Sequence, residues 1–363
     1  MTFSGSYNSE DVTFLLKPVR LEPTEVAEKE RLIQSGRRHY SEMISRENLP
    51  SPPYLRVFHE AAAREKGRFA RDLLTLARRI AADRPGRIAV ASLARAGTPV
   101  GVLLGRTLRR LLGRSASHYS LSIIRDRGVD ETALHHILSR HPAESVVFVD
   151  GWTGKGVIAA ELRRAIEQFN VRNGAALDPG LYAAADLCGA AAFAASAEDY
   201  LIPSSVLGAT VSGLVSRSIL NDAVVGPGDF HGCLFYQEFT PADLSRWFVD
   251  EVYEEIERQA HAEEAPADGV DAEGRARLRR ISEDFLADMG RRFGVRNVHH
   301  VKPGLGEATR VLLRRVPDRL LLRDPGRPEV AHLLVLARER DVPVDVDPAL
   351  PYAAAAIIKE IDG

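Results

Sequence analysis

One stretch, Ser145 to Glu167, constrains the fold more than any other, because it has the pattern of a strand, a short loop and a helix. Val146 to Val149 form an apolar run bounded by turn residues, which is typical of a strand buried on both faces of a parallel sheet. Open α/β sheets bind ligands at the carboxyl ends of their strands, so the glycine-rich loop after Asp150 is expected to face a ligand. Loop N–H groups beside a helix N-terminus favour an anion.

The loop is not a Walker loop, which requires a Ser or Thr after the lysine and a glycine six residues before it. VVFVD followed by Thr153-Gly154-Lys155-Gly156 instead resembles the ribose-5-phosphate motif of type I phosphoribosyltransferases. The chain departs from that motif in two ways: the second acidic residue is replaced by Gly151, and the loop is shorter. The alternative is an ordinary turn between a strand and a helix.

A second strand, loop and helix lie upstream, between Arg87 and Leu112. IAVASL is expected to be a strand, RAGTP a compact turn, and the segment after it an amphipathic helix. In type I phosphoribosyltransferases this position carries the diphosphate loop, which Arg95-Ala96-Gly97-Thr98-Pro99 resembles. The glycine lets backbone N–H groups approach a diphosphate, and the arginine can add a bidentate contact.

The segment between the two loops, Ser117 to Asp130, contains a strand pattern and an Arg-Asp-Arg-Gly turn. In the same enzyme family this segment is a mobile cover over the reacting centre. The candidates for such a cover are His118, Tyr119, Arg125 and Arg127. The alternative is a surface loop with solvated charges.

Length and composition limit the classes of protein. A chain of 363 residues exceeds the usual size of one domain, and 45% hydrophobic with 27% charged residues indicates a globular protein. The net charge of −2 gives no global signature of polyanion binding but does not exclude a local basic patch. Cys188 and Cys233 are too few for a disulfide scaffold or a zinc site and fit a reducing cytoplasm. The chain lacks a signal-peptide pattern and any run of about 18 apolar residues, so no membrane span is expected.

Other segments are less specific. Helical spacing covers residues 24–35 and 53–83, and between them His39 to Glu47 is either a solvated turn or part of a pocket. Residues 200–220 are rich in small and hydroxyl side chains, which suit either a hood over a nucleobase or tight packing. The site candidates in this block are Ser212 and Arg217, with Ser204, Thr210 and Ser216 beside them.

The C-terminal part has a βαβα rhythm of its own after a linker at residues 261–277 and a helix that ends at Gly294. KPGLGEATRVLLRR resembles the RNA-contacting turn and helix of the Pelota and kink-turn-binding ribosomal-protein superfamily. The matching residues are Lys302, Gly304, Gly306, Glu307, Thr309 and Arg310. Gly306 replaces that family's asparagine, while Arg310, Arg314 and Arg315 add a modest phosphate attraction. YAAAAIIKEI is expected to be a closing helix, and the alternative role of the module is packing against the enzyme or a sister subunit.

Several strings, including RHYSEM, RAGTP, VDGWTGKG, DYLIPS and TVSGLVSR, together resemble the StiP-type phosphoribosyltransferase-like family found near tellurite-resistance operons. The resemblance implies an α/β fold: a type I phosphoribosyltransferase-like parallel sheet with helices on both faces and a hood, plus a small C-terminal α/β/α Pelota-like domain. The expected parts are residues 1–260 for the first domain with an N-terminal extension, 261–294 for a linker and helix, and 295–363 for the RNA-binding domain.

The function implied by this resemblance is transfer of phosphoribosyl from 5-phosphoribosyl diphosphate to an unidentified acceptor. Thr153 to Gly156 would hold the 5-phosphate, with Gly151 and Trp152 beside it, Asp150 would orient the ribose or, through water, Mg²⁺, and Arg95 to Pro99 would bind diphosphate. Arg125 or Arg127 would close over the diphosphate. Mg²⁺ would come with the substrate, since the sequence shows no metal cluster, and a homodimer with RNA as a partner is expected.

Two other classes of function remain open. A cysteine protease, a label attached to this family, requires a cysteine with a positioned histidine. Cys233 has His231 two residues away, whereas Cys188 lies in an Ala-rich run typical of an inert core residue. A non-catalytic sensor of a phosphoribosyl metabolite that also binds RNA is favoured by the missing acid at Gly151.

Overall fold

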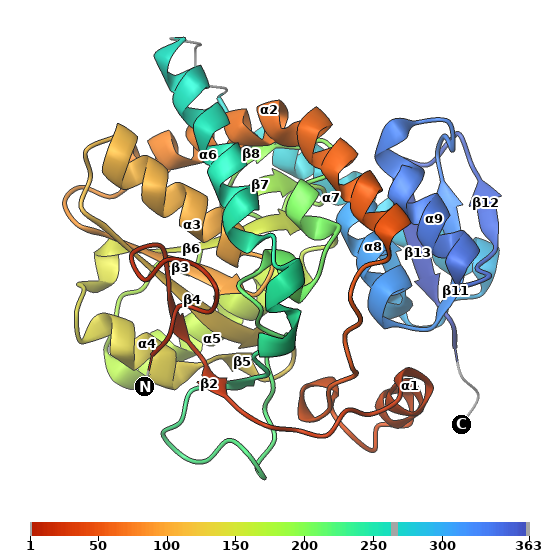
Figure 1. Ribbon diagram of the computed structural model, residues 1–363, viewed down its shortest axis with the longest axis horizontal. Coiled ribbons are helices and arrows are strands. Elements are labelled where there is room, and N and C mark those ends of the chain that lie inside the picture. Colours follow the sequence, from red (N-terminus) through yellow and green to blue (C-terminus); the bar gives the residue numbers. More distant parts are fainter. Residues whose placement is uncertain (1, 263–267, 361–363) are drawn as a thin grey trace.

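Six parallel strands form the central sheet of the larger part of the chain (Figure 1). The computed structural model describes residues 2–262 and 268–360. The strands lie in the order β1-β4-β3-β6-β7-β8, and β5 pairs antiparallel with the end of β4. Their bounds are Thr13–Leu15 for β1, Ile88–Ala94 for β3, Ala116–Ile124 for β4, Gly128–Val129 for β5, Val146–Thr153 for β6, Leu181–Asp186 for β7 and Phe193–Ser196 for β8. A separate parallel pair joins β2, Lys17–Pro18, to β9, Gly232–Cys233.

The strand order creates a crevice at one edge of this sheet. In the sheet β3 lies between β4 and β6. The chain passes from β3 to its neighbour β4 and then crosses over to β6, the neighbour of β3 on its other side. Ser92 of β3 is in register with Val149 of β6, and the helices that follow these strands, residues 98–106 and 157–173, pack on opposite faces of the sheet. Ligands bind at such switch points in open α/β sheets. The two glycine-containing loops expected from the sequence are therefore neighbours here.

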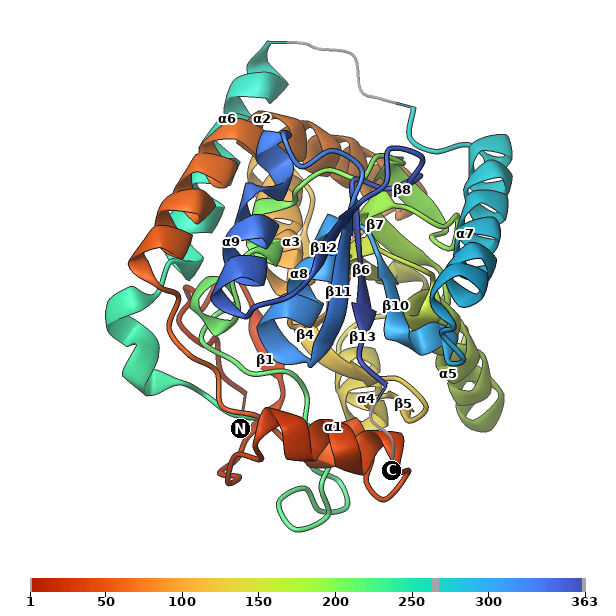
Figure 2. The same cartoon turned by 90° about the vertical axis from the view of Figure 1, so that its right-hand side faces the viewer.

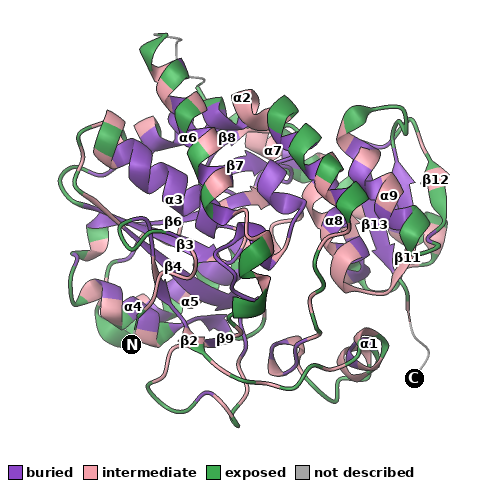
Figure 3. Cartoon of the chain, viewed as in Figure 1, coloured by how far each residue is buried: buried purple, intermediate pink, exposed green. Residues whose placement is uncertain are grey.

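Helices cover both faces of the sheet, as predicted. On one face α2, Pro52–Asp83, packs with α3, Thr98–Arg106, and α6, Ser245–His261. On the other face lie α4, Glu131–Leu138, and α5, Val157–Asn173. The alternation along β6 explains this arrangement, because Val147 and Val149 belong to the first core and Val146 and Phe148 to the second. Figure 3 shows the strands and the inner helix surfaces as the buried part of the molecule.

The C-terminal module is a four-stranded sheet with helices on both faces. The strand order is β10-β13-β11-β12, with bounds of Val301–Pro303, Ala354–Ile358, Pro317–Leu322 and Val344–Val346 in that order. Leu320 and Leu322 face α8, Leu305–Arg314, and α9, Ala331–Glu339. Leu321 faces the opposite side, where α7, Ala272–Phe293, packs through Phe285 and Met289. The predicted helix that ends at Gly294 is confirmed, with that glycine in the left-handed conformation at φ 65°.

One sequence prediction for this module is wrong. The segment YAAAAIIKEI does not form a closing helix; its residues 354–358 form β13, the strand between β10 and β11. All five residues are buried, so pairing with strands on both sides overrides the helix propensity of the alanines.

The N-terminal segment, residues 2–51, runs from the edge of the central sheet to the C-terminal module. Its helix α1, Val26–Gln34, lies below the C-terminal module in both views (Figures 1 and 2). Glu30 pairs with Arg315 through two hydrogen bonds of 2.6 Å, and Gln34 Nε2 donates to the Lys359 carbonyl oxygen at 2.9 Å. The apolar run after Asp11 forms β1, which settles the choice between a short helix and an added strand.

Hydrophobic packing joins the two sheets. Tyr54 and Ile202 of the larger part belong to the same buried cluster as Leu305 and Leu333 of the C-terminal module. Among the helices in residues 2–262 and 268–360, none is long and apolar enough to cross a bilayer.

Candidate functional site

A pocket lies where the C-terminal module meets the switch point of the central sheet. It has two lobes, with volumes of about 320 Å³ and about 170 Å³. We call the larger one the cation lobe and the smaller one the serine lobe. Both lobes are lined by Tyr40, Asp150, Trp152, Ile158, Arg217, Arg310 and Arg314. The central sheet, the N-terminal segment and the C-terminal module thus all contribute to one site.

The cation lobe is strongly positive. Its lining contains eight basic side chains, from Lys29, Arg125, Lys155, Arg217, Lys302, Arg310, Arg314 and Arg315, against two carboxylates, from Asp150 and Glu307. Glu307 pairs with Arg310 at 2.5 Å and lies 4.0 Å from Lys302. Arg125 pairs with Asp126 at 3.0 Å, so these contacts neutralise only part of the positive charge.

Three of these cations have nitrogens without a partner among the residues that the structure describes. Arg314 has no ion pair or hydrogen bond from its side chain, and neither has Lys29, which is only 5% exposed. Arg217 donates from Nη2 to the Met43 carbonyl oxygen, while its buried Nη1 has no partner. Burial and the nearby Arg95 lower the pKa of Arg314 to about 9, which leaves it charged at neutral pH. The lobe therefore has positive charge available for a ligand.

The predicted phosphate loop lines the cation lobe, but two of its side chains already have partners within the protein. β6 continues through Thr153, whose hydroxyl donates to Asp186 and so already has a partner. Lys155 Nζ donates to the carbonyl oxygens of Val298 at 2.6 Å and Val301 at 2.8 Å, so it fastens the C-terminal module to the sheet. Burial, with Lys302 nearby, lowers the pKa of Lys155 to about 6.

The glycines of this loop have different roles, and only Gly154 serves the contact with the C-terminal module. A Cβ on Gly154 would lie 2.8 Å from Glu307 Cγ, and Gly156 has a φ of 77° at the start of α5. At Gly151 a Cβ would make only ordinary contacts, the nearest at 3.8 Å, so space does not require a glycine there.

Asp150 and Trp152 lie on the border of the two lobes. The Asp150 carboxylate accepts a hydrogen bond from the Gly151 N–H at 2.8 Å, and burial raises the pKa of Asp150 to about 6 although Arg310 opposes this. The guanidinium of Arg310 lies 4.4 Å from the centre of the Trp152 ring, a cation–π contact. The indole Nε1 is buried and has no partner among the described residues.

In the predicted diphosphate loop, residues 95–99, the polar side chains are already bonded to other parts of the protein and are not free to bind a ligand. Arg95 pairs with Glu47 at 2.6 Å and donates to the Val215 carbonyl oxygen at 2.7 Å, so its charge is already neutralised. Thr98 Oγ1 bonds to Ser120 Oγ at 2.8 Å in the core, and Pro99 is buried at the start of α3. A Cβ on Gly97 would lie 2.8 Å from the Leu93 carbonyl oxygen, so that glycine serves packing. Only Arg95 and Ala96 of this loop line the serine lobe.

The four candidates for a cover divide into two pairs. His118 and Tyr119 lie inside β4: the His118 ring bonds to Ser92 Oγ at 2.7 Å and burial lowers its pKa to about 4, whereas Tyr119 bonds to His141 at 2.9 Å. These two residues do not line either lobe, because alternate residues of a strand buried on both faces point into the two cores. Arg125 lines the cation lobe, and Arg127 pairs with Glu42 at 3.2 Å outside it.

The hydroxyl-rich segment 203–218 lines the serine lobe. Its hydroxyl-bearing contributors are Ser204, Ser205, Ser212 and Ser218. Ser212 and Arg217, which the sequence singles out as site candidates, both line this lobe, and Ser212 Oγ donates to the Gly208 carbonyl oxygen at 3.1 Å.

The turn that resembles the RNA-contacting turn of the Pelota family, at residues 302–310, faces the central sheet and not solvent. Lys302, Glu307 and Arg310 line the cation lobe. Gly306 lies against the indole, since a Cβ there would be 2.5 Å from Trp152 Cε2. Gly304 is held at φ 86° against Leu187 and Asp199. Thr309 is fully buried and bonds to the Leu305 carbonyl oxygen and to His332, so it supports the helix and does not line the lobe.

Sequence reasoning missed two residues that help to build the pocket. Lys29 comes from α1, far from both loops in sequence, and carries no motif. Asp199 holds the C-terminal module in place, because its carboxylate accepts hydrogen bonds from the N–H groups of Leu305 and Ala353 at 2.9 and 2.8 Å. Burial raises the pKa of Asp199 to about 6. Of the two interpretations of residues 39–47, the pocket agrees with the structure for Tyr40, which lines both lobes.

Neither cysteine lines the pocket. Both are free and buried, and burial raises the pKa of each thiol to about 12, with Asp186 adding to the effect at Cys188. Cys188 Sγ lies 3.4 Å from Thr153 Oγ1 and from Asp186 Oδ1. Among the described residues, no histidine makes a hydrogen bond to either thiol. His231, two residues from Cys233, bonds instead to Ser122 Oγ at 2.8 Å.

These features define an α/β protein whose sheet-edge pocket is closed by a second, smaller α/β module. Residues 5–253 match the family described as tellurite-like stress resistance cysteine protease StiP, and residues 280–360 match the PELOTA RNA binding domain. The chain is 40% identical to a protein of Acinetobacter baylyi named cysteine protease StiP, over 99% of this chain and 95% of that protein. The chain therefore belongs to the StiP family. No solved structure matches it.

The comparisons correct the predicted activity. The relative that aligns with nearly the whole chain is named a cysteine protease, and nothing among the matches supports phosphoribosyl transfer. The prediction of a phosphoribosyltransferase, drawn from the two loops, is therefore wrong, and so is the substrate that went with it. The parallel sheet, the StiP resemblance and the Pelota domain are confirmed. The homodimer stays a prediction.

Proposed function

We propose that the chain binds single-stranded RNA through its phosphates in the cation lobe. The observation that carries this proposal is a set of cations that have no carboxylate partner among the described residues, Lys29, Arg217 and Arg314, which converge on one pocket from three separate parts of the chain. Burying unpaired charge is costly, so such a cluster is best explained by an anionic ligand. Arginines match phosphate oxygens through paired N–H groups, which gives them particular suitability for phosphate.

RNA is favoured over other anions because the Pelota match covers the residues that line the lobe. Lys302, Glu307 and Arg310 occupy the turn that resembles the RNA-contacting turn of that domain. The turn packs against Trp152 and Gly154, and the cation lobe of about 320 Å³ is far smaller than a duplex. Single strands can enter such sites, because their unstacked bases and phosphates are accessible.

A charge-removing variant tests this proposal. Arg314→Gln is expected to weaken binding of a fluorescein-labelled single-stranded oligoribonucleotide about tenfold, since a charge-assisted contact is worth about 1.5–3 kcal/mol. The slope of log affinity against log salt should fall by about 0.7 for each phosphate that the variant no longer neutralises. Fluorescence anisotropy over a salt series measures both quantities.

The matched control is Arg338→Gln, an exposed arginine of α9 that lines neither lobe. This variant should bind like the wild-type chain. Equal affinity and equal salt slope for Arg314→Gln and the wild type would contradict the proposal.

Mg²⁺, implied by the phosphoribosyltransferase resemblance, does not fit the lining. The cation lobe has two carboxylates, Asp150 and Glu307, and Glu307 is paired with Arg310. Mg²⁺ prefers several oxygen ligands, whereas this site presents eight basic side chains. Within residues 2–262 and 268–360 there is no cluster of three or more His, Cys, Asp or Glu that could hold a metal. The described residues therefore offer Mg²⁺ no set of protein ligands in this lobe.

The relative's name supports a second candidate function, peptide-bond hydrolysis by a cysteine. One observation favours Cys188 over Cys233 as the nucleophile. Cys188 follows β7 at the pocket edge, where a Cβ on Gly156 would lie 3.4 Å from its sulfur. A reactive cysteine needs a low thiol pKa and a base, and the buried thiol beside Asp186 has neither in this arrangement.

Thiol reactivity decides this second candidate. In the native chain both cysteines are expected to react with iodoacetamide at pH 7.5 at least tenfold more slowly than free cysteine, because a pKa of about 12 leaves little thiolate. Both should react fully after unfolding in guanidinium. Mass spectrometry of the labelled peptides measures each site separately. Rapid labelling of native Cys188 that a Cys188→Ser variant abolishes would support the peptidase and contradict this expectation.

A further inference from the structure

One amine in the cation lobe differs in character from the arginines around it. Lys29 of α1 lines the lobe and is 5% exposed. Its Nζ has no hydrogen bond or ion pair with any described residue, and unlike Arg217 Nη1 it keeps accessible surface. A buried lysine can lose its proton, whereas an arginine stays charged. The lobe therefore contains a primary amine that is open to a ligand.

The other two lysines of the lobe are already bonded to the protein. Lys155 Nζ donates to the carbonyl oxygens of Val298 and Val301, and Lys302 Nζ lies 4.0 Å from the Glu307 carboxylate. If Lys155 formed a bond to a ligand carbon, it would lose N–H groups and leave a carbonyl oxygen without its donor, which is costly. The carboxylate next to Lys302 favours its charged form. Lys29 is thus the lysine of this lobe that can react without breaking a contact.

The charges around Lys29 favour its neutral form. Burial, together with Arg217, Arg315 and Arg314, lowers the pKa of Lys29 to about 7, although Glu30 opposes this. Glu30 is itself paired with Arg315 through two hydrogen bonds. Lysines that are desolvated beside other cations are activated as nucleophiles in this way. At neutral pH a substantial share of the Lys29 side chains therefore has a free electron pair on Nζ.

The neighbouring arginines determine what such a nucleophile can meet. Arg314 has no partner among the described residues, and its charge acts on Lys29, so a phosphate that binds Arg314 lies close to the amine. Lysine amines attack carbonyl carbons to form imines. We infer that Lys29 Nζ forms an imine with an aldehyde that carries a phosphate group bound by Arg314. An abasic ribose within an RNA strand is one source of such an aldehyde, and a free sugar phosphate is another.

The covalent step requires no oxidant or reductant. The electron pair of Nζ attacks the aldehyde carbon, and a proton moves from the nitrogen to the carbonyl oxygen. The resulting hydroxyl leaves as water, and a carbon–nitrogen double bond forms. A phosphate held beside the amine raises the effective concentration of the aldehyde. The inference goes beyond the proposed RNA binding, because it assigns a reaction and shares with that proposal only the binding of phosphate in the cation lobe.

Reductive trapping on the full chain tests the inference. Sodium cyanoborohydride converts an imine into a stable amine, which mass spectrometry of the peptides locates. The probes are an oligoribonucleotide with one abasic ribose, the intact oligoribonucleotide, glyceraldehyde 3-phosphate and glyceraldehyde. At least one phosphate-bearing aldehyde is expected to label Lys29 about ten times faster than glyceraldehyde does, and intact RNA should give no adduct. Labelling by abasic RNA alone would identify the strand as the source, and labelling by glyceraldehyde 3-phosphate alone would identify a free sugar phosphate.

Two variants separate the amine from the phosphate site. Lys29→Arg keeps a positive charge but has no amine, so it should form no adduct even at probe concentrations that saturate it. Arg314→Gln should slow the labelling of Lys29 by phosphate-bearing aldehydes about tenfold and leave that by glyceraldehyde unchanged. The matched control is Lys66→Arg, outside both lobes, which should be labelled like the wild type. Labelling should become faster from pH 6.5 to 8.5, since only the neutral amine attacks.

Two results would overturn this inference alone. One is labelling of Lys29 that is no faster with phosphate-bearing aldehydes than with glyceraldehyde. The other is preferential labelling of Lys155 or Lys302. An oligoribonucleotide that does not bind, while glyceraldehyde 3-phosphate still labels Lys29, would overturn the proposed function and leave this inference standing.

Discussion

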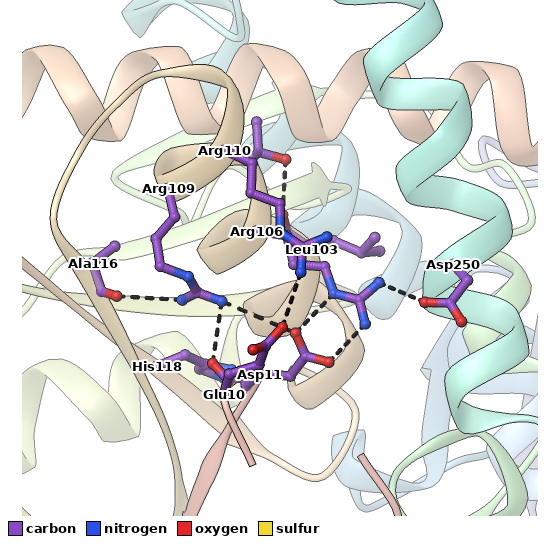
Figure 4. A network of polar contacts seen from close by, with 10 residues as sticks. Glu10, Asp11, Leu103, Arg106, Arg109, Arg110, Ala116, His118 and Asp250 are labelled. Carbon is purple, nitrogen blue, oxygen red and sulfur yellow. Dashed lines mark hydrogen bonds and ion pairs between the residues drawn. The ribbon is translucent and has the colours of Figure 1, made fainter. Parts of the chain in front are cut away.

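Replacing Asp11 with alanine is expected to lower the free energy of unfolding by about 3–5 kcal/mol, because it leaves a buried arginine without its main partner. Asp11 is fully buried and accepts two hydrogen bonds from Arg106, at 2.8 Å from Nε and 2.6 Å from Nη2 (Figure 4). Arg106 is 3% exposed. Although burial opposes its charge, hydrogen bonds to Asp11 and Asp250 raise the pKa of Arg106.

The pair also anchors the N-terminal segment to the rest of the chain. The Asp11 carbonyl oxygen lies 2.8 Å from His118 Nδ1 on β4, and Asp11 Oδ1 lies 4.0 Å from Arg109. Arg106 ends α3 and also bonds to Asp250 of α6 at 2.6 Å. Loss of the carboxylate would thus loosen a junction between β1, α3 and α6.

Urea unfolding followed by circular dichroism measures the decrease in stability. Asp250→Ala is the matched control, since its side chain is 55% exposed and makes one of the three bonds to Arg106. An exposed partner of this kind contributes about 0–1 kcal/mol. An Asp11→Ala midpoint within experimental error of the Asp250→Ala midpoint would contradict the expected role of the buried pair.

The elements that the sequence predicts well are those determined by local pattern. The strand, loop and helix at Ser145 to Glu167 form because the apolar run and the helical spacing lie next to each other in the chain. The same holds for the helix that ends at Gly294. The proximity of the two loops could also be predicted, since it follows from the rules of parallel sheets.

The errors concern partners that are distant in sequence. Lys155 looks like a phosphate ligand, yet it bonds to carbonyl oxygens of Val298 and Val301. Arg95 looks like a diphosphate ligand, yet Glu47 neutralises it. Local pattern cannot reveal these partners, because they are brought together only by the docking of the C-terminal module and the N-terminal segment. The wrong assignment of phosphoribosyl transfer has the same origin, since two loop motifs define a binding geometry and not a reaction.

The pH dependence of RNA binding should be controlled by Lys29 above neutral pH. Burial, together with the charges of Arg217 and Arg315, lowers the pKa of Lys29 to about 7. A bound phosphate adds negative charge to the lobe and favours the ammonium form, so the pKa of Lys29 rises in the complex. Between the pKa of the free chain and that of the complex, binding takes up a proton. Affinity should therefore fall by up to about tenfold for each pH unit above 7.

Other groups in the lobe act in the same direction at lower pH. Lys155 loses its charge and Asp150 gains one near pH 6, and both changes weaken the attraction for phosphate. Their effect is largely complete by pH 7. Arg314, with a pKa of about 9, begins to lose charge only toward pH 8.5, so Lys29 dominates the change just above pH 7. Burial also lowers the pKa of His299, so this histidine is neutral in that range.

Anisotropy titrations with a single-stranded oligoribonucleotide between pH 6.5 and 8.5 measure this dependence at constant ionic strength. Lys29→Met should bind weakly at every pH, and its affinity should change little above pH 7. The matched control is Lys66→Met on α2, whose side chain pairs with Glu251 at 2.9 Å outside both lobes. That variant should keep the full pH dependence of the wild type. A cation with a pKa near 7 cannot pair with an anion without coupling its titration to binding. Two results would therefore show that Lys29 does not contact the bound phosphate: a wild-type affinity that does not change from pH 7 to 8.5, or a pH dependence of affinity that is unchanged in Lys29→Met.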